Sequence, residues 1–363
     1  MSAVRGVWLS HLDGPAYGSP AALAEAIRFL ADAGFSHVFP VVWNRGFTFF
    51  PSRTMARTFG ADRSIDPAFR GRDPLAEIVA AAQGQRLRVI PWFEFGFAAA
   101  FGAEGAHLLE ARPSWAARDR SGAPLTRNGF SWMNSLDGEV QTFLIELITE
   151  VVSRYPVDGI QGDDRLPALP VEGGHEAATL AAWRAASGRP APRRDRDPHW
   201  MAWRSARLTD FLERLRREVK ALRPEALISM APGPHPFAYR HYLQDWPSWL
   251  ERGLVDLLHP QLYRHDASAY RRLLRANLAA VPPAARPGGP GPACTFAPGL
   301  LLMAGAYRAR PETLRACLRH NRSLGVSGEV LFHYQGLRTG GDAAAGYLRG
   351  IGYPEASGEE PAW

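Results

Sequence analysis

Hydrophobic residues gather in eight short runs along the chain, and most of these runs are apolar at nearly every position. A strand that is covered on both faces has such a run, whereas a half-exposed strand alternates apolar and polar positions. The pattern therefore predicts parallel strands buried between layers of helices. The predicted strands are Arg5–Ser10, His37–Trp43, Leu87–Phe93, Val157–Asp163, Ala226–Ala231, Val255–Tyr263, Ala293–Ala297 and Glu329–Tyr334.

Between these runs, apolar residues recur at three- and four-residue spacing, which predicts amphipathic helices. Ser19 and Asp73 each precede a proline and Asp137 precedes an apolar stripe, so these three residues are predicted helix N-caps. Strand followed by helix, repeated eight times, predicts an α/β fold of the (β/α)8 TIM barrel type, ahead of an open doubly wound sheet. We expect a single domain over residues 1–353 and a loose tail over residues 354–363.

Two connections are too long for ordinary loops between a strand and a helix. They run from Phe95 to Leu136 and from Arg165 to Pro198. Both follow the C-terminal end of a predicted strand, which is where a barrel builds its active site. These long loops predict a cleft for an extended ligand.

The fourth predicted strand ends in two adjacent carboxylates, within the string VDGIQGDD over Val157–Asp164. Side chains alternate along a strand. If Ile160 faces the helices, Gln161 and Asp163 face the barrel axis and Asp164 faces away. Asp163 is therefore the predicted catalytic residue, and Asp164 supports it. The alternative is that the pair caps the next helix or binds an arginine.

The other predicted strand ends, and the loops near them, carry acids, amides, a phenol and indoles. These groups are typical of a sugar-binding cleft, because aromatic faces stack on sugar rings while polar groups bind hydroxyls. For each tryptophan the alternative is core packing, and for Arg207 it is an ion pair with Asp210 or Glu213. The predicted substrate-binding residues are Asp13, Trp43, Asn44, Trp92, Trp132, Asn134, Arg207, His235, Tyr239, Asp245, Trp246, Gln261 and Tyr263.

Glycoside cleavage requires a protonated acid for the leaving oxygen and a second group that acts as base, nucleophile or orienting group. Glu94 follows the third predicted strand, next to Asp163 on the fourth, so these two residues are the predicted catalytic pair. The sequence leaves open whether their separation suits retention or inversion. It also leaves open that Asp163 is the acid and that an acetamido group of the substrate is the nucleophile.

Several blocks resemble the bacterial glycosyl hydrolase-like family ten. They include RGVWLSHLDG, VFPVVWNRGFTFFPS, RVIPWFEFGF, YPVDGIQGDD and HPQLYR, and the resemblance runs from Arg5 to about Gly336. It implies a (β/α)8 protein, and some family members hydrolyse peptidoglycan glycan strands stripped of stem peptides. The fourth-strand block is also similar to the DGFRxDA block of α-amylase barrels, whose nucleophilic aspartate falls on Asp163.

Three positions depart from the family pattern. Gly162 replaces a bulky aromatic residue, Arg165 replaces a histidine, and Gln335 replaces an acidic residue. Arg165 is expected to lower the pKa of a neighbouring aspartate, which suits a nucleophile better than an acid. These departures keep a catalytically silent glycan-binding barrel as the alternative function. A carbohydrate deacetylase is a third hypothesis, but it requires clustered metal ligands, and the histidines are scattered.

Composition narrows the choice of partners and cofactors. The net charge is +6, and one basic cluster comprises Arg189, Arg193, Arg194 and Arg196. No nucleic-acid motif accompanies this cluster, so it is predicted to be a solvated loop rather than a nucleic-acid site. Two cysteines are too few for a disulfide framework or a thiolate metal site. Neither a metal nor an organic cofactor is predicted.

The expected partner is a polysaccharide or oligosaccharide, and the protein is expected to be a monomer. No apolar window is long enough for a membrane span. The start, MSAVRGVWLS, lacks the apolar region of a signal peptide. The chain as written is therefore expected in the cytoplasm, or trimmed of an export signal, whereas the family resemblance implies export to the cell envelope.

Overall fold

The computed structural model describes residues 3–12, 14–286 and 289–350, which form a mixed α/β fold with two parallel sheets. Within each sheet, every pair of neighbouring strands is parallel. One sheet has the order β13 (Gly299–Leu301), β16 (Glu329–Phe332), β1 (Arg5–Leu9), β2 (His37–Pro40) and β5 (Arg88–Val89). The other has the order β12 (Thr295–Phe296), β11 (Leu257–Leu258), β10 (Leu227–Met230) and β9 (Gly159–Gly162).

The two sheets touch through single parallel bridges on both sides. Trp92, which follows β5, bridges to Gln161 of β9. Gln261, which follows β11, bridges to Gly299 of β13. The backbone N–H groups of residues beside these bridges therefore have partners across the junction, which satisfies donors that an open sheet edge would expose.

Two aspartates hold the starts of neighbouring strands in register. Asp158, just before β9, accepts a hydrogen bond from the Val89 backbone N–H (2.8 Å). Asp256, just before β11, accepts one from the Ile228 backbone N–H (2.8 Å). In both cases a carboxylate just before an apolar strand accepts a hydrogen bond from a backbone N–H of the adjacent strand. Asp158 therefore fixes the position of β9 relative to β5.

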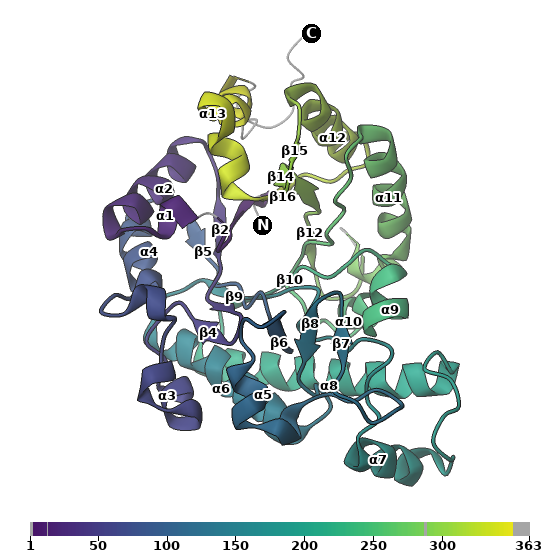
Figure 1. Ribbon diagram of the computed structural model, residues 1–363. Helices are drawn as coiled ribbons and strands as arrows, with labels where there is room; N and C mark the ends of the chain where they lie inside the picture. The colour runs from purple at the N-terminus through teal and green to yellow at the C-terminus, as the bar shows by residue number, and fades with distance from the viewer. Residues whose placement is uncertain (1–2, 13, 287–288, 351–363) are drawn as a thin grey trace.

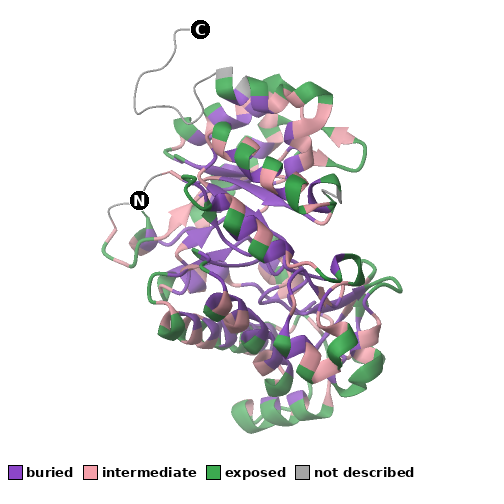
Figure 2. Cartoon of the chain, turned by 90° about the vertical axis from the view of Figure 1, so that its left-hand side faces the viewer, coloured by how far each residue is buried: buried purple, intermediate pink, exposed green. Residues whose placement is uncertain are grey.

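Helices surround these strands, as Figure 1 shows, with α2 and α4 on one side, α6 and α8 below, and α11 and α12 on the other side. Ser19, Asp73 and Asp137 accept hydrogen bonds from the first turns of α2, α4 and α6, so the three predicted N-caps are confirmed. Buried residues concentrate on the strands and exposed residues on the outer helix faces (Figure 2). The bounds are α2 (Pro20–Asp32), α4 (Pro74–Ala82), α6 (Gly138–Arg154), α8 (Pro198–Leu222), α11 (Ala267–Ala280) and α12 (Pro311–Ser323).

Each of the eight predicted runs contains an observed strand, but the strands are shorter than the runs. The second run was predicted to end at Trp43. Its parallel strand ends at Pro40, and Trp43 and Asn44 instead form β3 (Trp43–Asn44), which pairs antiparallel with β4 (Phe47–Thr48). The parallel strand β13 was missed, because a run of only three residues gives no periodic signal.

The two segments predicted to be long loops contain regular structure. The first holds an antiparallel sheet of order β6 (Ala98–Phe101), β8 (Phe130–Trp132), β7 (Thr126–Arg127), together with α5 (His107–Ala111) and a 3-10 turn, η3 (Pro113–Trp115). The second holds α7 (Ala177–Ser187). Small and polar residues in these segments masked the strand pattern.

The remaining elements are α1 (Gly14–Tyr17), α3 (Arg53–Phe59), α9 (Phe237–Tyr242), α10 (Trp246–Glu251), α13 (Tyr334–Gly350) and the antiparallel pair β14 (Met303–Ala304) and β15 (Tyr307–Arg308). Among the helices in the described ranges, none combines the length and apolar character that crossing a bilayer demands. The predicted tail over 354–363 lies outside the described residues.

Replacement of Gly159 by alanine is expected to destabilise the fold. A Cβ at this position would lie 2.2 Å from the Leu227 carbonyl oxygen of β10, so one of the two strands must move. We expect Gly159→Ala to lower the free energy of unfolding by about 1–3 kcal/mol, measured by urea denaturation. Gly138→Ala is the matched control, since a Cβ there meets nothing within 4 Å. Equal stability of the two variants would contradict the packing of β9 on β10.

Candidate active site

Three carboxylates converge on a single guanidinium group at the C-terminal ends of β5 and β9. Arg165 Nη2 donates to Asp163 Oδ2 (2.9 Å) and lies 3.8 Å from Glu94 Oε1. Arg165 Nη1 lies 3.1 Å from Asp164 Oδ1. The structure therefore brings together the predicted catalytic pair, Asp163 and Glu94, and Asp164, which was predicted to support them, and Arg165 links all three.

Asp163 is enclosed by hydrogen-bond donors. The Trp92 indole N–H donates to Asp163 Oδ2 (3.2 Å), and the Arg165 backbone N–H donates to Asp163 Oδ1 (2.9 Å). Gln244 Nε2 donates to the Asp163 carbonyl oxygen (2.8 Å). The Asp163 side chain has 0% exposure. Its position is consequently set by three different segments of the chain.

Glu94 lies in a second set of polar contacts. Asn44 Nδ2 donates to Glu94 Oε2 (2.5 Å), and His11 Nδ1 lies 3.3 Å from the same oxygen. Arg165 Nε donates to the Glu94 carbonyl oxygen (2.8 Å), so Arg165 contacts both the backbone and the carboxylate of this residue. The Glu94 side chain is 11% exposed.

The environments of the two predicted catalytic carboxylates shift their pKa values in opposite directions. Burial raises the pKa of Asp163 well above its usual range, although the charge of Arg165 opposes this rise. Burial would also raise the pKa of Glu94, but a hydrogen bond from His11 and the charge of Arg165 outweigh it, so the pKa of Glu94 falls. Arg165 does lower the pKa of its neighbour Asp163, as expected, but burial outweighs this effect and the net shift is upward. The expectation that Asp163 suits a nucleophile better than an acid is therefore not supported by its environment.

Asp164 and Tyr263 are the more accessible polar groups of the cluster. The Asp164 side chain is 32% exposed, and Tyr263 is half-buried. Burial raises the pKa of the Tyr263 phenol, and the charges of Asp164, Asp163 and Glu94 raise it further. Tyr263 therefore remains a neutral hydroxyl beside the carboxylates over the physiological pH range.

The Gln161 side chain lies between β1 and β10, which do not pair with each other. This is the inward direction that alternation along β9 predicts. It accepts a hydrogen bond from the Trp8 indole N–H of β1 (2.6 Å) and donates to the Ser229 hydroxyl of β10 (2.9 Å). Trp8 is buried, which agrees with its predicted role in the core, and its ring centroid lies 6.3 Å from those of both Trp92 and Tyr263.

The tryptophans that were predicted to bind sugar rings are buried, which corrects that expectation. Trp43 is fully buried, donates to the Gly96 carbonyl oxygen (3.1 Å) and packs against Phe143 of α6. Trp92 uses its indole N–H to hold Asp163. Trp132 and Trp246 are also buried. Apolar burial, the alternative for each tryptophan, explains all four, so none offers an open ring face to a sugar.

Several other predicted substrate-binding residues have structural partners. Asn134 is buried and accepts a hydrogen bond from the Leu136 backbone N–H (3.0 Å). Arg207 lies on the exposed face of α8 and forms the ion pair with Asp210 (3.0 Å) that was its alternative, while its contact with substrate stays a prediction. Gln261 donates to the Ala231 carbonyl oxygen (2.9 Å).

Four predicted residues after β10 lie together. The His235 and Trp246 rings are 5.6 Å apart, and the charge of Asp245 acts on the pKa values of both His235 and Tyr239. Asp245 also accepts a hydrogen bond from the Ser248 hydroxyl (2.6 Å). Their predicted role in substrate binding stays a prediction. Asp13, another predicted residue, lies outside the described residues.

Sequence reasoning missed the supporting roles of His11 and Gln244. His11 follows β1 within a recognisable block, so its place beside Glu94 had a signal in the sequence. Gln244 follows α9, far along the chain from Asp163, and no local pattern connects it with that residue. Its contact depends on tertiary packing alone.

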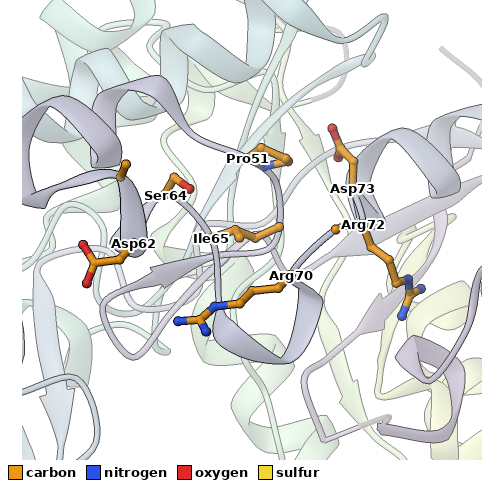
Figure 3. Close-up of a pocket in the computed structure, with 9 residues that line it drawn as sticks. Pro51, Asp62, Ser64, Ile65, Arg70, Arg72 and Asp73 are labelled. Atoms are coloured by element: carbon orange, nitrogen blue, oxygen red, sulfur yellow. The ribbon is translucent and has the colours of Figure 1, made fainter.

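A separate hollow of about 540 Å³ lies beside η1 (Ala61–Arg63), η2 (Pro67–Phe69) and the start of α4, and Figure 3 shows Arg72 pointing away from Asp62. Arg72 pairs with Glu77 (2.6 Å). Asp73 caps α4 and accepts from the Tyr155 hydroxyl (2.8 Å). These polar groups stabilise the local structure through an ion pair, a helix cap and a hydrogen bond. Over the described ranges, no three His, Cys, Asp or Glu side chains are grouped as metal ligands.

Carboxylates at the C-terminal ends of parallel strands are the arrangement seen in glycoside hydrolase folds. Residues 3–279 match the family model described as Glycosyl hydrolase-like 10, and the chain belongs to this family. The resemblance drawn from the sequence is thereby confirmed. The glycosyl hydrolases DigH of Escherichia coli K12 and of Escherichia coli O6:H1 are each 24% identical over 300 residues, which cover 72% of this chain. The chain spans 65% of the length of these relatives.

Solved structures show the same fold at low sequence identity. The PgaB (BpsB) glycoside hydrolase domain from Bordetella bronchiseptica has a TM-score of 0.70 at 16% identity and covers 96% of this chain and 99% of that one. The catalytic domain of a β-amylase from Paenibacillus polymyxa has a TM-score of 0.62 at 10% identity, with 97% and 98% covered. Both are similar to this chain in fold.

Replacement of Arg165 by glutamine is expected to destabilise the protein, because three carboxylates lose their shared cation. Breaking a buried ion pair from one side costs about 3–5 kcal/mol. We expect Arg165→Gln to lower the free energy of unfolding by about this amount at neutral pH, measured by urea denaturation. Arg207→Gln, which breaks an exposed pair, is the control, with an expected loss of about 1 kcal/mol or less. Similar small losses for both would mean that Arg165 does not hold the cluster together.

Proposed function

We propose that this protein is a glycosidase that cleaves a bacterial polysaccharide containing N-acetylhexosamine, such as peptidoglycan glycan strands without stem peptides. The observation that carries the proposal is the pair Asp163 and Glu94, whose pKa values move apart within one cluster. Two carboxyl groups with separated pKa values can serve as acid and base in the same site. Membership of the glycosyl hydrolase-like family supports this reaction class.

In this proposal, Asp163 is the general acid and Glu94 is the ionised partner. Asp163, with its raised pKa, protonates the leaving glycosidic oxygen, and Glu94, with its lowered pKa, acts as base or nucleophile. Asp163 is covered, so substrate reaches it after Arg165 leaves Asp163 Oδ2 and keeps its contact with Asp164. Tyr263 and Asn44 then lie beside the sugar as hydrogen-bonding groups.

The proposal includes a closed (β/α)8 barrel as the scaffold. Support comes from the two bridges that join the parallel sheets, Trp92 to Gln161 and Gln261 to Gly299. The contact between Trp8 of β1 and Gln161 of β9 also crosses the space that the strands enclose. A closed barrel directs the C-terminal ends of all its strands to one opening, where the carboxylates lie.

A catalytically silent glycan-binding barrel is the second candidate. The observation that favours it is Arg165, which occupies the carboxylates where the family has histidine, together with the complete burial of Asp163. A barrel fold is compatible with either function.

The Asp163→Asn variant is expected to lose cleavage of denuded peptidoglycan glycan strands and of chitin-type oligomers, by about a hundredfold or more, because an amide cannot supply the proton. Product release measured by chromatography checks this. Asp210→Asn on the exposed face of α8 is the matched control and should retain full activity. Cleavage retained by Asp163→Asn would exclude its catalytic role, and binding without cleavage by the wild type would favour the silent barrel.

The pH dependence of kcat/KM distinguishes the roles of the two carboxyl groups. Glu94 must be ionised, so activity falls as the pH drops through its lowered pKa. Asp163 must be protonated, so activity falls as the pH rises through its raised pKa. Arg165→Gln should move the alkaline limb to higher pH, because Arg165 lowers the pKa of Asp163. Activity that keeps increasing into the alkaline range would show that Asp163 works as an anion.

A further inference from the structure

A hollow of about 350 Å³ opens beside the connection from α7 to α8, at the lower right of Figure 1, and arginines dominate its lining. It contains four guanidinium groups and two carboxylates. The lining residues are Arg120, Val171, Glu172, Arg193, Arg194, Asp195 and Arg196. Three of these arginines, Arg193, Arg194 and Arg196, belong to the basic cluster that the sequence predicts to be a solvated loop, and the structure places them in a concave surface.

The two carboxylates of the hollow already have cationic partners. Arg120 Nη2 donates to Asp195 Oδ1 (2.7 Å). Arg127 Nη1, from β7, donates to Glu172 Oε2 (2.6 Å). Neither carboxylate is therefore available to neutralise the remaining arginines of the lining.

The remaining arginines carry excess positive charge. Arg193 and Arg194 are exposed, and neither has an ion-pair partner in the part of the chain that the structure describes. Arg196 donates to Nδ1 of His241 (3.2 Å), which also accepts from Arg127 (2.8 Å). A guanidinium can only donate, so this nitrogen is an acceptor and His241 is neutral there. Burial lowers the pKa of His241, and the charges of Arg127 and Arg196 lower it further.

A buried arginine fixes the walls of the hollow. Arg204 of α8 donates to the backbone carbonyl oxygens of Val171 (2.8 Å), Asp195 (2.7 Å) and Gly173. Its guanidinium carbon lies 4.5 Å from the centroid of the Trp200 ring. Two of the three backbone segments that line the hollow are thus held by α8. Walls that are already ordered reduce the entropy lost when a ligand binds.

The hollow lies close to the carboxylate cluster. The guanidinium carbon of Arg165, which contacts the three carboxylates, lies 5.1 Å from the centroid of the Phe130 ring. Phe130 of β8 pairs with Arg127 of β7. Arg127 donates to Glu172 in the lining, and its guanidinium carbon lies 4.9 Å from the centroid of the Tyr242 ring. A chain of direct contacts therefore connects the lining of the hollow with Arg165.

We propose that the arginine hollow binds carboxylate groups of an acidic polysaccharide, so that the substrate of this protein is a glycan whose sugars carry carboxylates. The inference rests on the proposed function, because it takes the strand at Asp164 to extend past Tyr242. Guanidinium groups bind carboxylates in a bidentate geometry that a neutral sugar cannot offer. The contacts that connect the lining with Arg165, through Arg127 and Phe130, favour a glycan over a nucleic acid as the occupant.

The test compares an acidic and a neutral oligosaccharide of equal length. The full chain with Asp163→Asn is titrated by calorimetry with a hyaluronan-type oligosaccharide, which alternates N-acetylglucosamine and glucuronic acid, and with a chitin oligosaccharide. Arg193→Glu combined with Arg194→Glu reverses the charge of the hollow. Arg271→Glu combined with Arg272→Glu is the matched control, because these adjacent arginines are exposed on α11 and change the net charge equally.

We expect the acidic oligosaccharide to bind more tightly than the neutral one and to lose affinity as salt is added, since salt screens exposed charges. The change at Arg193 and Arg194 should weaken its binding by about tenfold, the loss of two exposed ion pairs. It should leave chitin binding unchanged, and the control should change neither. Circular dichroism verifies that both variants fold.

Other outcomes would overturn the assignment. Equal affinity for the two oligosaccharides, or equal weakening by both double variants, would exclude the arginine hollow as the acidic subsite. Tighter binding of a single-stranded oligonucleotide of equal charge would reassign the hollow to nucleic acid. Failure of the proposed function is distinguishable. If the wild type cleaves no glycan but binding of the acidic oligosaccharide still depends on Arg193 and Arg194, the glycosidase proposal is wrong and the acidic subsite stands.

Discussion

The guanidinium of Arg165 is the interaction on which the carboxylate cluster depends. Glu94, Asp163 and Asp164 bring three carboxyl groups together at the ends of two strands, and burial opposes the ionisation of Asp163. One planar cation reaches all three, and its Nε also holds the backbone after β5. The ends of β5 and β9 are therefore joined by charge as well as by the bridge at Trp92, and the shape of the site follows from this shared contact.

The strands and the main helices were predictable because their signals are local. Apolar runs located a strand in each of eight places, and side-chain capping fixed the starts of α2, α4 and α6. In the antiparallel sheet of β6, β8 and β7, the pairing of β6 with β8 joins segments far apart in sequence, which short runs do not reveal. The pairing of β7 with β8 is a local hairpin across Asn128-Gly129, a turn signal that the analysis of apolar runs did not use. The early end of β2 also has a local cause, since Trp43 and Asn44 form a hairpin with β4 across Arg45-Gly46.

The acids of the site were predictable from strand parity, whereas the aromatic residues were not. Asp163 and Gln161 lie where alternation along β9 places them. The local sequence does not distinguish a buried tryptophan near a strand end from an exposed one. Trp43 is buried because it packs against Phe143 of α6, which is far away in sequence. The pKa of Asp163 shows a related limit. The sequence shows the charge of Arg165, but the dehydration that outweighs it is a property of the folded environment.

The hydrogen-bonded row of Trp8, Gln161 and Ser229 has an evolutionary consequence. Gln161 accepts from one neighbour and donates to the other in the buried space between β1 and β10. Removing either neighbour leaves a buried amide group without its partner, at a cost of about 1–3 kcal/mol. Substitutions at these three positions are thus coupled, and related chains should exchange them together as a set. Positions 8, 161 and 229 thus act as one energetic unit, although most of the first half of the chain separates the first two.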